Sequence, residues 1–279
     1  RRHEWIGKHD GKVKIRDELE IYKKLHNTPE TKDLVSPCVV LGRFDGESDL
    51  LLFVERIKDS NEICPEDIAC RDRVNAVIDA FRRINVHAGV RHLDIKPSHI
   101  LFLRGTNNVK VIDFGLSHRR DLPPCSDQFR GTLKFSSLFQ HQGSLSNVSV
   151  DAQSLCFLFE FLTNGRALPW SGDCEFNDLN RLVVLSGKIH ALQAQNGSEW
   201  LNKARALSLS IPQTEETAFE LISGSSNQIT ASPVQQSQQP RTSPPEEVLP
   251  KKRLQIESPT SPAASSRQSA KSSDRKSVV

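Results

Sequence analysis

The stretch HLDIKPSH at residues 92–99, followed downstream by DFG at residues 113–115, decides the interpretation of this chain. Two short apolar runs, ILFL and VKVI, lie between the two segments and are joined by a polar turn that contains glycine and asparagine. Apolar runs separated by such a turn predict a β-hairpin. The two ends of an antiparallel hairpin meet at one edge, so Asp94 and Asp113 are predicted to lie close together. Two carboxylates and a lysine at one edge suit a site that handles phosphate and a divalent cation.

These segments resemble the catalytic loop and the metal-binding triplet of eukaryotic protein kinases, whose usual forms are H-R-D-L-x-x-x-N and D-F-G. The resemblance implies that Asp94 orients the hydroxyl of a protein substrate and that Lys96 places a cation beside the γ-phosphate of ATP. It also implies that Asp113 holds Mg²⁺ through a carboxylate oxygen. Phe114 and Gly115 complete the triplet. The resemblance implies that Phe114 is a packed part of the nucleotide site and that Gly115 permits the turn after Asp113.

Two residues depart from the kinase pattern. His99 stands where the second metal ligand is normally asparagine, and imidazole nitrogen is a poorer partner for Mg²⁺ than an amide oxygen. Three alternatives follow: one metal ion suffices, a nearby group substitutes, or catalysis is impaired. Leu93 replaces the arginine with which many kinases bind a phosphorylated activation loop, so control by loop phosphorylation is not expected.

The N-terminal part is predicted to contain a helix over residues 13–26, where apolar residues recur at helical spacing. It resembles the helix αC of casein kinase relatives, which implies that Glu18 pairs with the phosphate-binding lysine; Glu20 is the alternative. No Gly-rich loop or V-A-I-K strand precedes it. Lys8 is the one close candidate for that lysine, although its surroundings do not resemble a strand. Because the chain contains no methionine, we expect the front of this lobe to lie outside it.

Two strands are predicted at residues 37–41 and 50–54, around a turn at residues 44–47. They resemble the fourth and fifth strands of the kinase fold. The resemblance then implies that Val54 is the gatekeeper and that the following hinge, with Glu55 and Ile57, meets the adenine ring through its backbone.

Farther along, residues 65–88 predict one long helix that delivers the catalytic loop. GTLKFSS at residues 131–137 resembles the activation-segment motif of casein kinase relatives. Asp151 is a predicted N-cap, and the helix behind it is apolar nearly all round, as in a helix buried in a large core. The resemblance implies that this aspartate ties down the catalytic-loop backbone. Residues 177–210 predict one or two further helices.

The C-terminal stretch, residues 222–279, is rich in Ser, Pro and Gln and is predicted to be disordered. It contains Ser-Pro steps and a short basic cluster, Lys251, Lys252 and Arg253, which is a weak nuclear-import signal. The formal net charge is only +3, so no nucleic-acid surface is expected. Scattered cysteines without a Cys-x-x-Cys pair favour an intracellular setting, cytoplasmic or nuclear. No apolar run is long enough to span a membrane.

The sequence therefore predicts an α+β, bilobal protein-kinase-like fold with a truncated β-rich N-lobe, a mainly helical C-lobe and a disordered tail. The predicted divisions are residues 1–60, 61–210 and 222–279. The function implied is a protein serine/threonine kinase that uses ATP and Mg²⁺. One alternative is a pseudokinase or scaffold module, because of His99 and the missing lysine. The other is a small-molecule kinase of the aminoglycoside or choline type, against which the motif at residues 131–137 argues.

Overall fold

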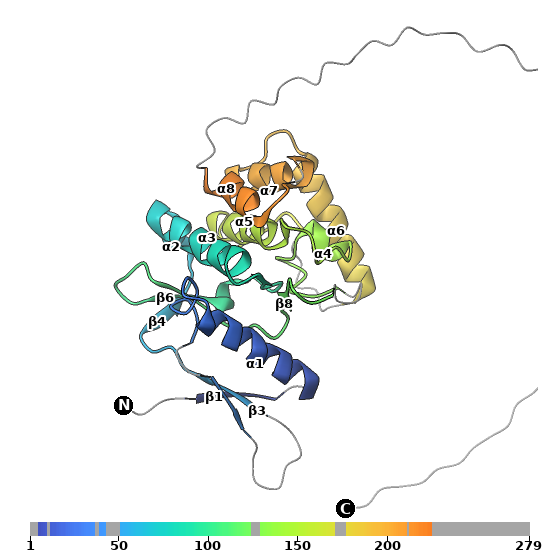
Figure 1. Ribbon diagram of the computed structural model, residues 1–279. Coiled ribbons are helices and arrows are strands. Elements are labelled where there is room, and N and C mark those ends of the chain that lie inside the picture. The colour runs from blue at the N-terminus through green and yellow to red at the C-terminus, as the bar shows by residue number, and fades with distance from the viewer. Residues whose placement is uncertain are drawn as a thin grey trace, which may run out of the picture. The chain divides into compact units, whose positions relative to one another are not determined.

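A computed structural model of the chain describes residues 5–9, 12–36, 39–42, 51–123, 129–170, 177–210 and 212–224 (Figure 1). The chain divides into two units, Arg1–Thr230 and Ala231–Val279, and every described residue belongs to the first. The predicted turn at residues 44–47 lies outside the described residues. So do the Ser-Pro steps and the basic cluster of the tail.

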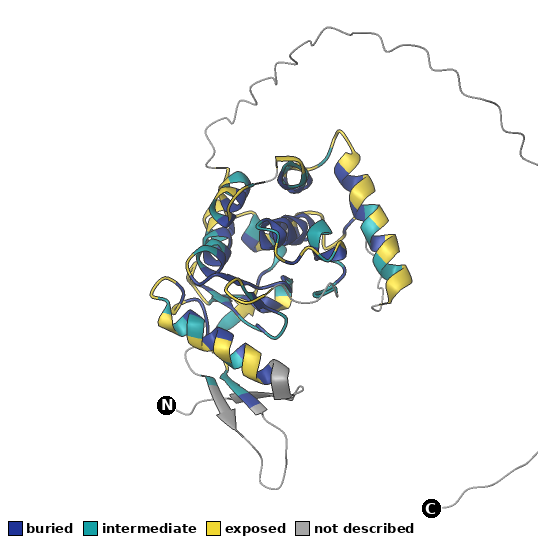
Figure 2. Cartoon of the chain, turned by 45° about the vertical axis from the view of Figure 1, so that its right-hand side comes forward, coloured by how far each residue is buried: buried dark blue, intermediate teal, exposed yellow. Residues whose placement is uncertain are grey.

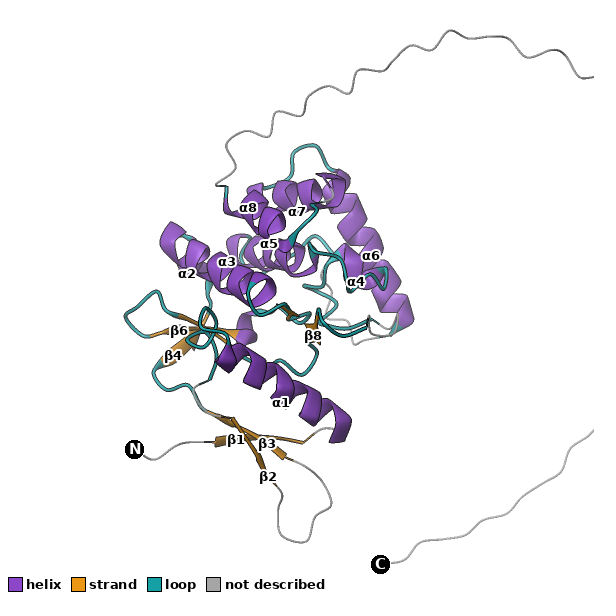
Figure 3. Cartoon of the chain, in the orientation of Figure 1, coloured by secondary structure: helices purple, strands orange, loops and turns teal. Residues whose placement is uncertain are grey.

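The N-terminal part is a three-stranded antiparallel sheet with a helix beside it (Figure 3). Its order is β1 (Trp5–His9), β3 (Leu51–Glu55) and β2 (Val39–Gly42). The helix α1 (Lys12–Asn27) confirms the predicted helix and buries its apolar side chains in the main core. Strand β1 was not expected. The interpretation that the surroundings of Lys8 are not strand-like is wrong, because the backbone of Lys8 pairs with that of Leu52 in β3.

The predicted hairpin is present as β6 (Ile100–Leu103) and β7 (Val109–Val111), paired from Ile100 opposite Val111. Residues of β6 alternate between buried and half-buried, as the period of a strand requires. On its outer side β6 pairs with β4 (Ser60–Glu62). A 3₁₀ turn, η1 (Pro97–His99), leads into the hairpin. A separate two-stranded ladder joins β5 (Val90–Arg91) to β8 (His118–Arg119).

The C-terminal part is helical and is organised around α5 (Val150–Thr163). All residues of α5 from Val150 to Leu162 are buried, and Figure 2 shows this helix dark blue among its neighbours. The other helices are α2 (Pro65–Ile68), α3 (Arg71–Val86), α4 (Leu138–His141), α6 (Asp178–Gln193), α7 (Glu199–Ser210) and α8 (Glu215–Ser223). The fold is therefore mixed α/β, with small sheets followed by a helical region.

Three details differ from the sequence predictions. The predicted helix at residues 65–88 is broken into α2 and α3, because Cys70 has an extended backbone and serves as the N-cap of α3. The N-cap of α5 is Ser149, and Asp151 lies inside the first turn. The predicted start of the tail at residue 222 falls within α8, where Ile222 is fully buried. None of the described helices combines the length and apolar character that a membrane span requires.

Candidate active site

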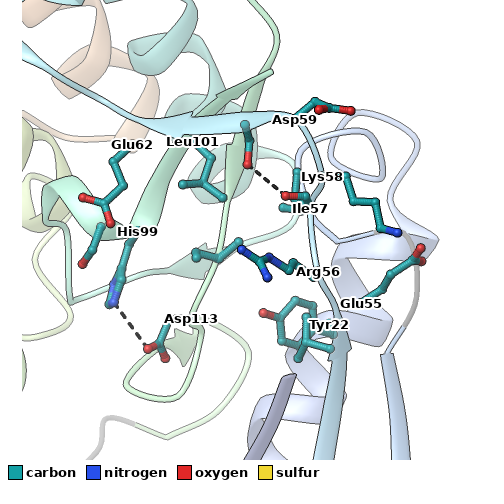
Figure 4. Close-up of a pocket in the computed structure, with 14 residues that line it drawn as sticks. Tyr22, Glu55, Arg56, Ile57, Lys58, Asp59, Glu62, His99, Leu101 and Asp113 are labelled. Carbon is teal, nitrogen blue, oxygen red and sulfur yellow. Dashed lines mark hydrogen bonds and ion pairs between the residues drawn. The ribbon is translucent and has the colours of Figure 1, made fainter. Parts of the chain in front are cut away.

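A cleft of about 810 Å³ lies between the β6–β7 hairpin and the segment that follows β3 (Figure 4). It takes side chains from α1, from the segment between β3 and β4, from η1, and from the hairpin and the residues just after it. These are Tyr22, Val54, Glu55, Arg56, Ile57, Lys58, Asp59, Ser60, Glu62, Ser98, His99, Leu101, Ile112 and Asp113. The predicted gatekeeper and hinge residues and both predicted metal ligands therefore line one cavity.

His99 joins the two ends of the hairpin. Its Nδ1 lies 2.9 Å from the backbone oxygen of Asp94. Its Nε2 lies 3.3 Å from Oδ2 of Asp113 (Figure 4). A carbonyl oxygen can only accept a hydrogen bond, so Nδ1 is the donor in the first contact. The hairpin thus brings Asp94 and Asp113 to one edge, with a single imidazole between them.

The carboxylate of Asp94 is nearly buried and has a partner on each oxygen. Oδ2 accepts a hydrogen bond of 3.0 Å from Lys96, and Oδ1 accepts one of 2.7 Å from the hydroxyl of Thr132. Burial raises the pKa of Asp94, but the Thr132 hydroxyl, His99 and Lys96 outweigh it and lower that pKa below its usual 3.8. Asp94 is therefore ionised at neutral pH.

Asp151, in the first turn of α5, holds the backbone just before Asp94. Its carboxylate accepts hydrogen bonds from the backbone N–H of His92 at 2.7 Å and of Leu93 at 3.1 Å, and from the side chain of Asn85 at 2.9 Å. These bonds fix Leu93 in the left-handed region, with φ of 65°. The contact implied by the resemblance is present, although Asp151 is not the N-cap.

The side chain of Leu93 is buried in a small cluster of its own. Leu145 and Val150 pack against it, with Phe139 at the margin. The position where many kinases carry an arginine is therefore occupied by an apolar contact. No charge is offered there to a phosphorylated loop.

Aromatic rings form the floor beneath the two aspartates. Phe114 is fully buried and lies between Tyr22, at 5.2 Å, and His92, at 5.0 Å, measured between ring centroids. His92 Nε2 donates to the backbone oxygen of Ile112 at 3.0 Å, while its Nδ1 accepts from the N–H of Asp94 at 3.3 Å. Burial lowers the pKa of His92, which agrees with this neutral tautomer.

Glu18 and Glu20, the two candidates on α1, have different surroundings. Glu18 is buried, and its Oε2 lies 3.2 Å from the point where a Cβ on Gly115 would stand. Glu20 is exposed and pairs with Lys23 at 2.7 Å. The pKa of Tyr22, one turn after Glu18, is raised by burial and by the charges of Glu18 and Asp113. The carboxylate of Glu18 therefore lies beside Gly115, whereas Glu20 is exposed on the surface of α1.

The segment at residues 131–137 lies against the catalytic loop and is held from α6. Gly131 has φ of 109°, and a Cβ there would stand 2.4 Å from the backbone oxygen of Leu93. Lys188 of α6 is fully buried and donates to the backbone oxygens of Leu133 at 2.7 Å and Ser136 at 2.5 Å. Burial lowers the pKa of Lys188 well below its usual 10.5.

Comparison with known protein families matches residues 8–241 to the protein kinase domain. This chain belongs to the protein kinase domain family. Among characterised proteins, the casein kinase 1-like protein HD16 of Oryza sativa subsp. japonica is 34% identical over 97 residues. That match covers 30% of this chain and 14% of the rice protein, so it bears on a small part of the relative.

The kinase cleft contains some predicted nucleotide contacts and not others. Glu55 and Ile57 line it directly. Glu18, Phe114 and Gly115 are not among the residues that line it, and their predicted parts in nucleotide binding stay predictions. Across the described residues no group of three or more His, Cys, Asp or Glu side chains is arranged to hold a metal ion.

Three features of this kinase site were missed in the sequence. Gln140, the fourth residue of a capping box that starts at Ser137, donates to the backbone oxygens of Leu93 at 2.6 Å and Arg130 at 2.7 Å. Lys188 gave no signal, because one lysine in a mixed helix is normally exposed. The ladder between β5 and β8 is two residues long, which is too short to show a period.

Proposed function

We propose that this kinase transfers the γ-phosphate of ATP to a serine or threonine hydroxyl of a protein substrate. The observation that supports the proposal is the surroundings of Asp94, an ionised carboxylate with Lys96 on one oxygen and Thr132 on the other. A carboxylate so placed accepts or orients the proton of an incoming hydroxyl. Such a general base typically contributes about 10²- to 10⁴-fold to a rate.

Lys96 and Thr132 act on Asp94 and on its neighbourhood. The side chain of Lys96 is 30% exposed, so its ammonium can reach the developing charge on a phosphoryl group while it stays beside Asp94. The Thr132 hydroxyl keeps the other carboxylate oxygen in place. Thr132 belongs to the motif at residues 131–137, which favours a protein substrate over a small molecule.

The cleft suits a nucleotide, and one of its two candidate metal ligands suits Mg²⁺. Val54, Ile57, Leu101 and Ile112 give it apolar walls, as a purine requires. The carboxylate of Asp113 is the oxygen ligand that Mg²⁺ prefers, whereas the imidazole of His99 is not. When bound, ATP and its divalent cation supply the phosphoryl group and neutralise its charge.

We assign Lys8 as the phosphate-binding lysine within this proposal. The support is its place in the backbone: β1 comes immediately before α1, which carries Glu18, and Lys8 is in register with Leu52 of β3. Replacing Lys8 by methionine should raise the KM for ATP with little change in the melting temperature. An unchanged KM for ATP would remove Lys8 from the site.

The test is phosphate transfer from radiolabelled ATP to casein, with Mg²⁺ or Mn²⁺ present. Asp94→Asn keeps the shape of the side chain and should lower the rate by at least about 10²-fold. Glu20→Gln, on the exposed face of α1, is the matched control and should leave the rate unchanged. Activity that survives Asp94→Asn in a folded protein would overturn the assigned role.

The contact between His99 and Asp113 favours a second candidate, a pseudokinase that binds nucleotide without transferring phosphate. Asp113 already contacts His99 at 3.3 Å, and because Mg²⁺ binds imidazole poorly, Mg²⁺ at Asp113 would compete with this contact. ATP binding measured by calorimetry, together with the absence of transfer in the casein assay, would establish this alternative. Transfer that Asp94→Asn abolishes would exclude it.

A further inference from the structure

His99 presents one defined nitrogen to the cleft. Because Nδ1 donates to the backbone oxygen of Asp94 at 2.9 Å, Nε2 is the nitrogen that faces Asp113. The His99 side chain is only 6% exposed, and the ring of His92 packs against it at 5.7 Å. The imidazole cannot turn away without breaking both contacts, so the direction of Nε2 is fixed by the fold.

The spacing of the two side chains is that of two ligands on one ion. Transition ions bind imidazole nitrogen and carboxylate oxygen at about 2.0–2.2 Å, so two such ligands stand about 3.0–3.4 Å apart at ordinary coordination angles. The distance from His99 Nε2 to Asp113 Oδ2, 3.3 Å, lies in this range. Both residues line the cleft, and Asp113 is 37% exposed, so an ion can reach them from solvent.

The support behind His99 is also that of a metal ligand. Metal-binding histidines almost always donate their second ring nitrogen to a carbonyl or a carboxylate, which fixes the tautomer and aims the free nitrogen. The bond from Nδ1 to the Asp94 oxygen does this. Since no third His, Cys, Asp or Glu side chain joins His99 and Asp113 among the described residues, water or a bound ligand would supply the remaining ligands of an ion.

The kind of donor decides the kind of ion. Mg²⁺ requires oxygen ligands and binds imidazole poorly, while Co²⁺ and Zn²⁺ bind imidazole well and stand above Mn²⁺ in the general order of affinity. We propose that His99 Nε2 and Asp113 Oδ2 form a two-residue site for an imidazole-preferring divalent ion, Co²⁺ or Zn²⁺, and that His99 sets the metal specificity of this cleft. The inference rests on the proposed function for the use of the ion, but ion binding itself can be measured without nucleotide.

The experiment titrates the full chain with Co²⁺ at pH 8, in the absence of nucleotide, and follows visible absorption and heat of binding. Mg²⁺ is titrated in parallel. His99→Asn restores an amide at this position and should weaken Co²⁺ binding by at least about 10- to 100-fold, the loss seen when even the supporting residues of a metal ligand are changed. The same variant should also reduce the ratio of the Mg²⁺ dissociation constant to the Co²⁺ dissociation constant. His87→Asn, at the exposed C-cap of α3, is the control for surface histidines and should bind Co²⁺ like the wild type.

A second variant, Asp113→Asn, keeps the imidazole and should also weaken Co²⁺ binding. Circular dichroism establishes that each variant is folded. The proposal is overturned if His99→Asn binds Co²⁺ as the wild type does, or if the wild type binds Mg²⁺ more tightly than Co²⁺. A Co²⁺ site that depends on His99 in a protein without phosphate transfer would refute the proposed function and support this inference. Transfer with Mg²⁺ in a protein without such a site would do the reverse.

Discussion

The two loops beside Asp94 are each held by one buried charged side chain, and the two are satisfied in opposite ways. Asp151 of α5 holds the catalytic loop by accepting hydrogen bonds from two backbone N–H groups and from Asn85. Lys188 of α6 holds residues 131–137 by donating to backbone oxygens, and its Nζ lies 3.1 Å from Nε2 of His141. No salt bridge in the described part of the chain involves Lys188.

The different surroundings of Asp151 and Lys188 indicate which of the two loops is held more firmly. A carboxylate that accepts several N–H donors keeps its charge at little cost, and each bond to a charged group is stronger than a neutral one. A buried ammonium with only neutral acceptors has its charge disfavoured, and the pKa of Lys188 is accordingly lowered. We therefore expect the catalytic loop to be rigid and the segment at residues 131–137 to adjust more readily.

Replacing Asp151 by alanine should have the largest effect. It leaves two backbone N–H groups and the Asn85 amide buried without their acceptor, and we expect the free energy of unfolding to fall by about 3–5 kcal/mol. Asp178→Ala is the matched control, because Asp178 also lies in the first turn of a helix but its side chain is 93% exposed. Urea denaturation measures both. Equal effects would mean that Asp151 does not anchor the loop.

Replacing Gly131 by alanine tests the place where the two loops touch. The new Cβ would meet the backbone oxygen of Leu93 at 2.4 Å and Nε2 of Gln140 at 2.8 Å. Together with the positive φ, this should destabilise the protein by about 2–4 kcal/mol. Gly105→Ala is the control, since Gly105 also has a positive φ but nothing within 4 Å, and it should lose only about 1–2 kcal/mol. If the two losses are equal, the contact between the loops is not tight.

Replacing Lys188 by methionine should change stability less, by about 1–2 kcal/mol or less, because it also removes a disfavoured buried charge. Its main effect should be on the substrate side, as a higher KM for the protein substrate with an unchanged KM for ATP. Lys23→Met is the control for loss of a lysine, because the side chain of Lys23 is exposed on α1. A fall in stability as large as that of Asp151→Ala would contradict the comparison.

The pH dependence of stability should reflect His141, which lies beside Lys188 at the segment of residues 131–137. Burial and the neighbouring Lys188 and Arg181 lower the pKa of His141 from its usual 6.5 to about 3. Between these values the unfolded chain binds more protons at this residue than the folded chain, so stability should fall as pH decreases from about 6.5 towards 3. His141→Gln should flatten this slope in urea denaturation at pH 4–7. An unchanged slope would place the acid sensitivity elsewhere, for example at His92.

The hairpin and the central helix were predictable because their signals are local. The runs ILFL and VKVI and the turn between them determine which end carries Asp94 and Asp113. Because α5 is apolar on nearly all sides, its sequence predicts that the helix is buried. These local signals could not identify the groups that the carboxylate of Asp151 binds, because those groups lie 58 or more residues away. That contact was predicted from the family resemblance alone.

The misses have one physical cause, which is pairing between distant segments. Strand β1 is defined by its partner β3 some 45 residues later, and its own sequence carries little apolar pattern. The boundary of the tail was misplaced because α8 depends on tertiary contacts. Its first residue, Glu215, accepts from Arg91 at 2.7 Å and from Arg120 at 3.0 Å, which ties α8 to the ends of β5 and β8.

The apolar setting of Leu93 has a consequence for how the molecule is governed. Leu145 and Val150 hold the side chain of Leu93 by apolar packing, a contact that neither a phosphatase nor a change in ionic strength would remove. At Leu93 the catalytic loop therefore needs no phosphorylated residue to take up the arrangement seen in the structure. We therefore expect regulation of this protein to act at places other than Leu93, such as the cleft.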